Sequence, residues 1–262
     1  MNTGFGVSAM IAPGLIAPLA TAAEEHGYAT FWVNDVPGGN GLEQLARAQA
    51  ATSTIELGVG VLPVDRWSAE QVGKEVTANG LDTSRLILGI GAGNVQSGSI
   101  EAVRSLAEAL PGTTGARVFI GALGPKMCAL AGQVSDGVLL NWLIPAAAHE
   151  LGRQTIDASL RAGRKRPGIY AYVRTAAARA ADDRLEREAS SYEGYPSYKR
   201  HFDRMGVRAI ETAINGNDTD IRERYHSFAG IADEVVCRAI VANETLDDYL
   251  GVLRAARPVP SD

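Results

Sequence analysis

Short apolar runs alternate with longer amphipathic stretches along the chain. The runs are rich in β-branched residues and are bounded by turn residues, a pattern that predicts strands. Apolar residues three and four positions apart predict helices in the stretches between them. The predicted strands cover residues 5–7, 30–33, 55–62, 86–90, 117–121, 137–140, 169–173 and 234–241. The predicted helices cover residues 14–26, 41–53, a stretch from Ser68, 100–110, a stretch from Pro125, 145–163 and 246–256.

The spacing of these elements predicts the fold. Successive strands begin one strand-plus-helix repeat apart, except for a long gap before the last strand, which predicts a helical insertion at about residues 182–230. Repeats of this kind with right-handed crossovers close into a (β/α)8 barrel, whereas a doubly wound sheet usually has fewer strands and leaves its edges open. We therefore predict an α/β fold, a TIM barrel with short loops, formed by residues 1–262 as one domain.

Composition and charge narrow the range of partners. Lys and Arg number 25 against 30 Asp and Glu, a net charge of −5, so no basic excess favours nucleic acid or anionic membranes. No uncharged run is long and continuous enough to span a bilayer. The two cysteines, Cys128 and Cys237, lie far apart in apolar contexts and no secretion signal is evident, so we expect reduced thiols and a cytoplasmic protein. The scattered histidines predict no metal site.

Small residues gather where the predicted strands end, which in a barrel is the face that carries the active site. Glycine at these positions lets a flat or phosphorylated ligand approach the backbone. The sequence therefore predicts a cofactor site at this face. Its candidate residues are Asp35, Gly60, Val61, Gly91, Gly93, Asn94, Gly121, Ala122, Leu123, Gly124, Lys126, Asn141 and Arg174.

The segment from Gly121 to Lys126 runs directly from a strand into a helix. Free backbone amides, the positive end of the helix and Lys126 could converge there on a phosphate. The alternative is an ordinary glycine turn that closes a tight connection. The glycines at 89–93 also invite a dinucleotide-binding interpretation, but Asn94 stands where the G-x-G-x-x-G pattern needs its last glycine.

Asp35 is the one carboxylate directly after the second predicted strand. At the end of a barrel strand it could form a hydrogen bond to a ligand. It could equally cap the glycine-rich turn at residues 38–41. Both interpretations stay open at the level of the sequence.

These motifs together resemble the luciferase-like monooxygenase superfamily, barrel enzymes that use FMN or the deazaflavin coenzyme F420. The resemblance implies a flavin or deazaflavin ring across the barrel mouth, with its phosphate near Gly121 to Gly124. It also implies that Gly60-Val61 is the family's non-prolyl cis peptide, and that the protein forms a homodimer. The segments that carry it are residues 23–28, 31–35, 57–64, 85–93, 120–127, 131–132, 135–140 and 232–240.

The chain departs from the family where a proton donor is expected. Many deazaflavin members have His where this chain has Val36, and some sugar-phosphate dehydrogenases have Glu where it has Asn94. Asp35 and Asn94 are therefore the catalytic candidates that remain, and the always-protonated Arg174 suits an anion better than proton transfer. The segment between Gly93 and Arg117 also holds only one helix, so the chain is a trimmed member.

The leading hypothesis is an oxidoreductase that transfers a hydride between reduced coenzyme F420 and a small organic substrate. An FMN-dependent monooxygenase is the near alternative, and a degenerate, non-catalytic flavin-binding barrel is the third.

Aromatic residues recur at near-helical intervals in the insertion. An aromatic stripe with such spacing is more often core packing than substrate wall. Because the insertion follows a strand end, we still expect part of it to form a lid over the barrel mouth. The stripe comprises Tyr192, Tyr195, Tyr198 and Phe202.

Overall fold

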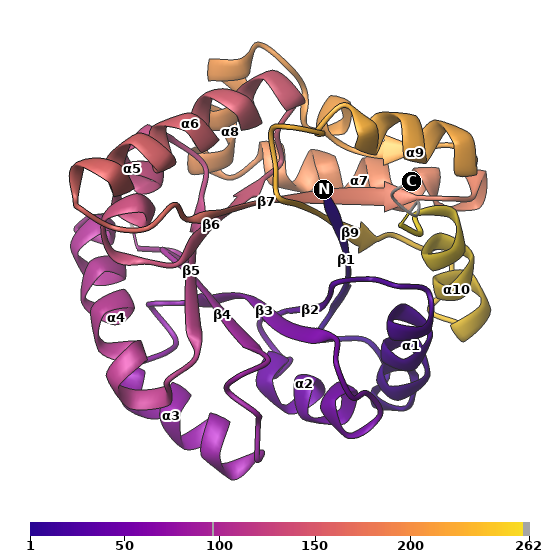
Figure 1. Cartoon of the computed structure of the whole chain (residues 1–262). Helices are drawn as coiled ribbons and strands as arrows, with labels where there is room; N and C mark the ends of the chain where they lie inside the picture. The colour runs from indigo at the N-terminus through magenta and orange to yellow at the C-terminus, as the bar shows by residue number, and fades with distance from the viewer. Residues whose placement is uncertain (96, 259–262) are drawn as a thin grey trace.

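A closed ring of eight parallel strands forms the centre of the molecule (Figure 1). The computed structural model describes residues 1–95 and 97–258. Strand β1 pairs with β2 on one side and β9 on the other, and β6 pairs with β7, so the ring has no open edge. The predicted TIM barrel is confirmed. Its strands are β1 (Asn2–Ser8), β2 (Thr30–Asn34), β3 (Glu56–Pro63), β4 (Leu86–Gly91), β5 (Arg117–Ala122), β6 (Gly137–Asn141), β7 (Gly168–Ala176) and β9 (Glu234–Ala239).

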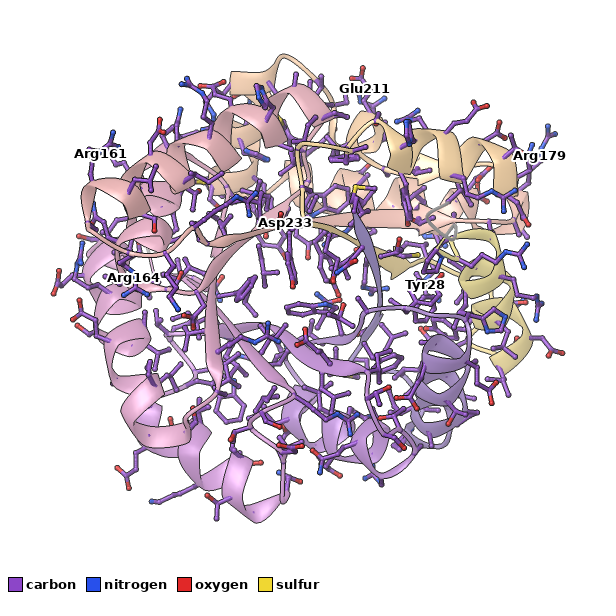
Figure 2. All side chains as sticks on the ribbon, viewed as in Figure 1. Tyr28, Arg161, Arg164, Arg179, Glu211 and Asp233 are labelled. Atoms are coloured by element: carbon purple, nitrogen blue, oxygen red, sulfur yellow. The ribbon has the colours of Figure 1, made fainter. Side chains whose placement is uncertain are left out.

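Helices surround this ring and cover the outer face of the strands (Figure 1). In Figure 2, charged side chains such as Arg161 and Arg179 extend outward from the ring of elements. Within residues 1–95 and 97–258, no helix is both long and apolar enough to span a membrane. The barrel helices are α1 (Pro13–Glu25), α2 (Gly41–Ala50), α3 (Ala69–Ala78), α4 (Ser99–Thr114), α5 (Pro125–Val134), α6 (Pro145–Arg161) and α10 (Leu246–Ala255).

The predicted insertion lies between β7 and the eighth barrel strand, β9. Besides the expected helices it contains a short strand, β8, which pairs with the end of β7 outside the ring. This pairing and the one with β9 extend β7 to Ala176, beyond the predicted end at residue 173. The elements of the insertion are η1 (Arg179–Ala181), α7 (Asp182–Glu193), α8 (Pro196–Met205), η2 (Ala209–Thr212), β8 (Ile214–Asn215) and α9 (Asp218–His226).

Local chemistry explains where several helices begin and end. The capping box of Ser68 and Gln71 forms as predicted at the start of α3. Helix α2 was predicted to reach residue 53 but ends at Ala50, because the carboxylate of Glu24 accepts backbone N–H groups from residues 53–55 at 2.6–3.1 Å. These bonds replace the amide partners that a longer helix would supply.

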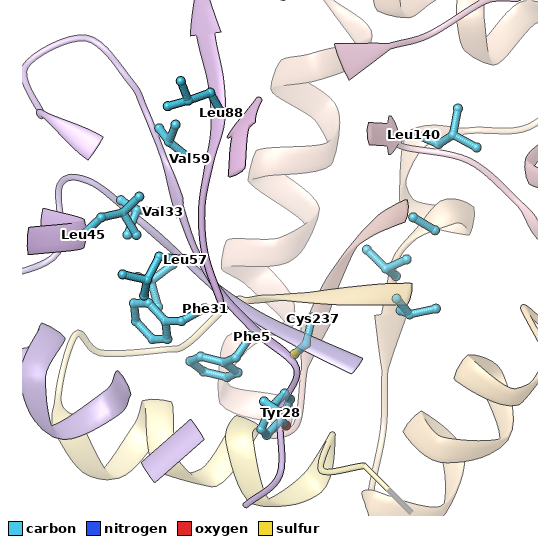
Figure 3. Close-up of a cluster of buried hydrophobic side chains, with 14 of the residues drawn as sticks. Phe5, Tyr28, Phe31, Val33, Leu45, Leu57, Val59, Leu88, Leu140 and Cys237 are labelled. Atoms are coloured by element: carbon cyan, nitrogen blue, oxygen red, sulfur yellow. The ribbon is translucent and has the colours of Figure 1, made fainter. Parts of the chain in front are cut away.

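Two apolar cores lie on the two faces of the barrel wall. The outer core packs helices against strands, and Figure 3 shows Phe5, Phe31 and Leu57 within it. The inner core fills the barrel, so the ring encloses packed side chains and not a pore. A β-carbon at Gly58 would overlap the indole of Trp32, which explains glycine in the middle of β3. The inner core consists of Trp32, Ile87, Phe119, Leu139, Tyr170, Tyr172 and Val236.

Candidate cofactor site

A backbone bulge at Gly60-Val61 lies at the mouth of the barrel, where β3 ends. The peptide bond between these residues is cis, as the resemblance implied, and the register between β3 and β4 shifts here. The side-chain amide of Asn34 donates to the carbonyl oxygen of Gly60 at 2.8 Å, and the Tyr172 hydroxyl donates to Asn34 Oδ1 at 2.9 Å. Asn34 at the end of β2 and Tyr172 on β7, across the barrel, thus hold the bulge in one orientation.

The glycines beside this bulge have a packing role that the sequence did not reveal. A β-carbon at Gly91 would lie 2.8 Å from Val61 Cγ2, and one at Gly121 would lie 2.8 Å from Val61 Cγ1. Both glycines therefore make room for the Val61 side chain, which packs against the inner core. Their predicted contact with a cofactor stays a prediction.

The Asp35 carboxylate is enclosed by protein donors. Its side chain has no solvent exposure. It accepts from the Gly41 backbone N–H at 3.0 Å and from Trp67 Nε1 at 2.9 Å, and it forms an ion pair with Arg66. The structure thus bears out the second interpretation of Asp35, that it caps the turn before α2. These donors already occupy its oxygens, and a role in orienting a ring or a water molecule stays a prediction.

Asp65 holds the turn after β4 that carries Asn94. The Asn94 backbone N–H donates to Asp65 Oδ2 at 3.1 Å. Gly93 has a φ of 59°, and a β-carbon there would overlap the same carboxylate. The Asn94 side chain is exposed and its carboxamide does not titrate, so its predicted catalytic role is limited to hydrogen bonding.

The start of α5 offers the predicted phosphate site. Gly124 occupies the N-cap position and has no side chain to bind the first amides of the helix, and Lys126 is exposed in the first turn. Arg204 reaches this turn from α8, and its guanidinium donates to the carbonyl oxygen of Leu123. A β-carbon at Gly124 would lie 3.3 Å from Arg204 Nη1. Arg204 therefore lies at a helix N-terminus whose first turn also carries Lys126, a donor set that suits phosphate.

Arg174, at the end of β7, is held on all sides and is only 3% exposed. Its Nε lies 3.1 Å from Glu188 Oε1, and its Nη1 donates to Asn141 Oδ1. The guanidinium carbon lies 4.0 Å from the ring centroid of Trp142 and 5.1 Å from that of Tyr192. Cation–π contacts and the ion pair together offset the cost of burying the charge.

Helices α7 and α8 cover the ends of β6 and β7. The Trp142 ring centroid lies 4.8 Å from that of Tyr192 and 6.2 Å from that of Phe202, and Tyr192 lies 4.7 Å from Tyr198. Three of the four aromatic residues of the stripe thus pack at the mouth, as the lid hypothesis requires, whereas Tyr195 is half-exposed. Trp142 itself has a φ of 53°, unusual for a residue with a side chain.

His201 fastens α8 to the β6 end. Its Nε2 lies 2.7 Å from the carbonyl oxygen of Trp142, and its Nδ1 accepts from Arg204 at 2.7 Å. Nε2 therefore carries the proton of a neutral imidazole. Burial lowers the pKa of His201, and the neighbouring Arg204 charge adds to the decrease.

Sequence reasoning missed Asn34, Tyr172 and Asp65, and it also missed four groups in or beside the insertion. Three lie in the insertion, where helical spacing would have placed Glu188 beside Tyr192 and His201 beside Arg204. The fourth, Arg238, follows Glu234 and Val236 at the alternate positions of β9 that face the barrel interior. No group of three or more potential metal ligands gathers among the residues that the structure describes.

Residues 6–99 match the family model described as luciferase-like monooxygenase. The matched segment runs from β1 to the first residue of α4, and it contains the Gly60-Val61 bulge. The resemblance to the luciferase-like monooxygenases is confirmed. As expected from the sequence, the described residues between β4 and β5 form a single helix, α4.

A curated relative is also similar to this chain in sequence. A 5,10-methylenetetrahydromethanopterin reductase from Methanolobus tindarius is 29% identical over 195 residues, 60% of this chain and 60% of that protein. The chain thus spans about three fifths of the length of this curated relative.

Two solved structures share the barrel fold. The coenzyme F420 dependent tetrahydromethanopterin reductase from Methanopyrus kandleri has a TM-score of 0.77 at 17% identity, covering 95% of this chain and 97% of that one. The oxygenating constituent of 3,6-diketocamphane monooxygenase from Pseudomonas putida, in complex with FMN, has a TM-score of 0.72 at 11% identity, covering 98% and 96%.

Proposed function

We propose that this chain is a deazaflavin-dependent oxidoreductase that transfers a hydride between reduced coenzyme F420 and a small organic substrate. The observation that carries the proposal is the pairing, on one barrel face, of the fixed Gly60-Val61 bulge with the cationic start of α5. The bulge provides a rigid apolar surface for a flat ring, and the helix start provides donors for a phosphate. The reductase from Methanopyrus kandleri, described as coenzyme F420 dependent, supports this choice of cofactor.

When bound, the deazaflavin would supply the hydride carrier, and the chain would supply orientation and exclusion of water. Lys126 and Arg204 would bind the phosphate, while Asn34 and Tyr172 would keep the bulge in place. The aromatic side chains of α7 and α8, namely Tyr192, Tyr198 and Phe202, would exclude water from the mouth. Because the oxygens of Asp35 are occupied and Asn94 does not titrate, the proton would come from water or from the substrate itself.

FMN-dependent oxygenation is the second candidate, supported by the monooxygenase structure that contains FMN. The same residues would bind either cofactor, because both carry a tricyclic ring and a phosphate. A barrel that binds a flavin without catalysis is the third candidate. We also propose a homodimer, which rests on the family resemblance alone and which sedimentation of the purified protein would test.

Titration of the purified protein with oxidised F420 and with FMN, followed by the absorbance and fluorescence of each ring, tests the proposal. We expect saturable binding of F420 that is tighter than binding of FMN. Tighter binding of FMN would favour the second candidate. If neither ring spectrum changes at saturating protein concentration, the proposed function is wrong.

A further inference from the structure

Two arginines stand side by side at the mouth of the barrel. Arg174 on β7 and Arg238 on β9 are paired in the register of these adjacent strands. Each arginine lies two positions after a residue of the inner core: Arg174 after Tyr172, and Arg238 after Val236. Since side chains two apart on a strand share a face, both arginines belong to the layer that faces the barrel interior at the strand ends.

A single carboxylate from the insertion faces this pair of cations. Glu188 on α7 lies 3.1 Å from Arg174 and is about three-quarters buried. Burial raises the pKa of the Glu188 carboxyl, but the charges of Arg238 and Arg174 outweigh burial and lower the pKa overall. The layer therefore holds one positive charge more than Glu188 balances.

Glu188 accepts a hydrogen bond from only one of the donor nitrogens of Arg174. It contacts the Nε atom, while Nη1 donates to Asn141 and the flat faces contact Trp142 and Tyr192. The guanidinium of Arg238 donates to the neighbouring carbonyl oxygen of Ala239 and is half-buried. Guanidinium groups bind carboxylates best through two parallel hydrogen bonds, an arrangement that the contact of Glu188 does not reach.

We propose that an organic anion binds between Arg174 and Arg238, and that Glu188 from α7 occupies this position until the ligand displaces it. The anion is a carboxylate of the substrate or a deprotonated ring of the cofactor. Displacement of Glu188 would remove the ion pair that joins α7 to β7. Ligand binding would in this way loosen the contact between the lid and the barrel. The identity of the ligand rests on the proposed function, whereas the anion site itself does not.

The probe is benzoate, a planar carboxylate. The readout is the fluorescence of Trp142, which contacts Arg174. The variant Trp142→Phe shows which part of the fluorescence signal comes from Trp142. Removing the internal competitor in Glu188→Gln should tighten benzoate binding about tenfold or more. Arg238→Met should weaken binding of benzoate at least about tenfold. Glu186→Gln is the matched control, because Glu186 lies on the same helix but pairs with the exposed Arg208. If Arg238→Met does not fold, as judged by circular dichroism, Arg238→Gln replaces it.

Equal benzoate affinity in the parent, Glu188→Gln and the Arg238 variant would overturn the proposal. To separate the two sources of the anion, reduced F420 is titrated with and without saturating benzoate. Unchanged cofactor affinity assigns the site to the substrate, and competition assigns it to the ring. If the variants alter benzoate binding as expected but neither cofactor binds, the anion site stands and the proposed function fails.

Discussion

The two halves of the barrel mouth are built in different ways. Over β2 to β4, the loops bind one another: Asp35 accepts from residues of the next loop, and Asp65 accepts from the turn after β4. Over β5 to β9, the strand ends bind the insertion instead, through contacts such as Arg174 with Glu188 and Arg204 with Leu123.

The family model matches the first half and ends at residue 99, before the second half begins. The half that the family model matches is closed by its own carboxylates, while the other half uses cations that a helix of the insertion covers. Under the proposed function, the first half would provide the ring surface and the second half would set which phosphate or substrate anion is accepted.

The largest effect should come from breaking the first half at Asp35. Asparagine cannot balance the charge of Arg66, so Asp35→Asn should lower the free energy of unfolding by about 3 kcal/mol or more. Urea denaturation measures the change. Glu43→Gln is the control, since Glu43 forms an exposed pair with Arg47 and should matter by less than about 0.5 kcal/mol. Loss of turnover without loss of stability would instead give Asp35 a catalytic role.

A buried carboxyl beneath both halves should make stability depend on pH. Glu234 on β9 is fully buried, and burial raises its pKa to about 7, although Thr30 and Trp32 donate to it. The folded state therefore holds a proton that the unfolded state releases near pH 4.5. The contribution of Glu234 to the free energy of unfolding is fully present below about pH 4.5, and it falls by about 3 kcal/mol as the pH rises to 7.

Unfolding of Glu234→Gln across pH 4 to 8 measures this effect as the difference from the parent, so that the titration of His201 cancels. The glutamine variant should be less sensitive to a rise in pH over that window. Identical pH profiles for the two proteins would show that Glu234 is charged throughout, and that Thr30 joins β2 to β9 through a hydrogen bond to a carboxylate.

Much of the first half could be predicted from the sequence because its determinants are local. The strands, the capping box at Ser68, the turn that Asp35 caps and the Gly60-Val61 bulge all depend on residues close in sequence or on a family motif. The second half depends on how α7 and α8 dock. Glu188 and Arg204 meet partners in β7 and the β5–α5 turn, and no periodicity fixes that placement. Likewise, the reason for Gly121 became visible only with the Val61 side chain above it.

The third prediction tests the second half at the start of α5. In Gly124→Asp, the new carboxylate would lie beside Arg204 and repel a phosphate, so cofactor affinity should fall at least about 100-fold while the fold is kept. Titration with F420 and FMN measures the loss. Gly14→Asp is the matched control, since Gly14 has open space around it and lies in the first turn of α1. Parental affinity in Gly124→Asp would place the phosphate elsewhere.

The smallest effect should come from Arg204 alone, because Lys126 and the amides of α5 would remain. Arg204→Met should weaken cofactor binding about tenfold, the loss of one charge-assisted contact. It also removes the bond to Leu123 and the donor to His201, so α8 should detach more readily and Trp142 should become more accessible to acrylamide. Arg200→Met on the exposed part of the same helix is the control and should change neither quantity. If Arg204→Met increases accessibility at unchanged affinity, Arg204 fastens the lid and does not bind the phosphate. In the second half of the mouth, Lys126 and the amides of α5 would then bind the phosphate, and Arg174 and Arg238 would select the other anion.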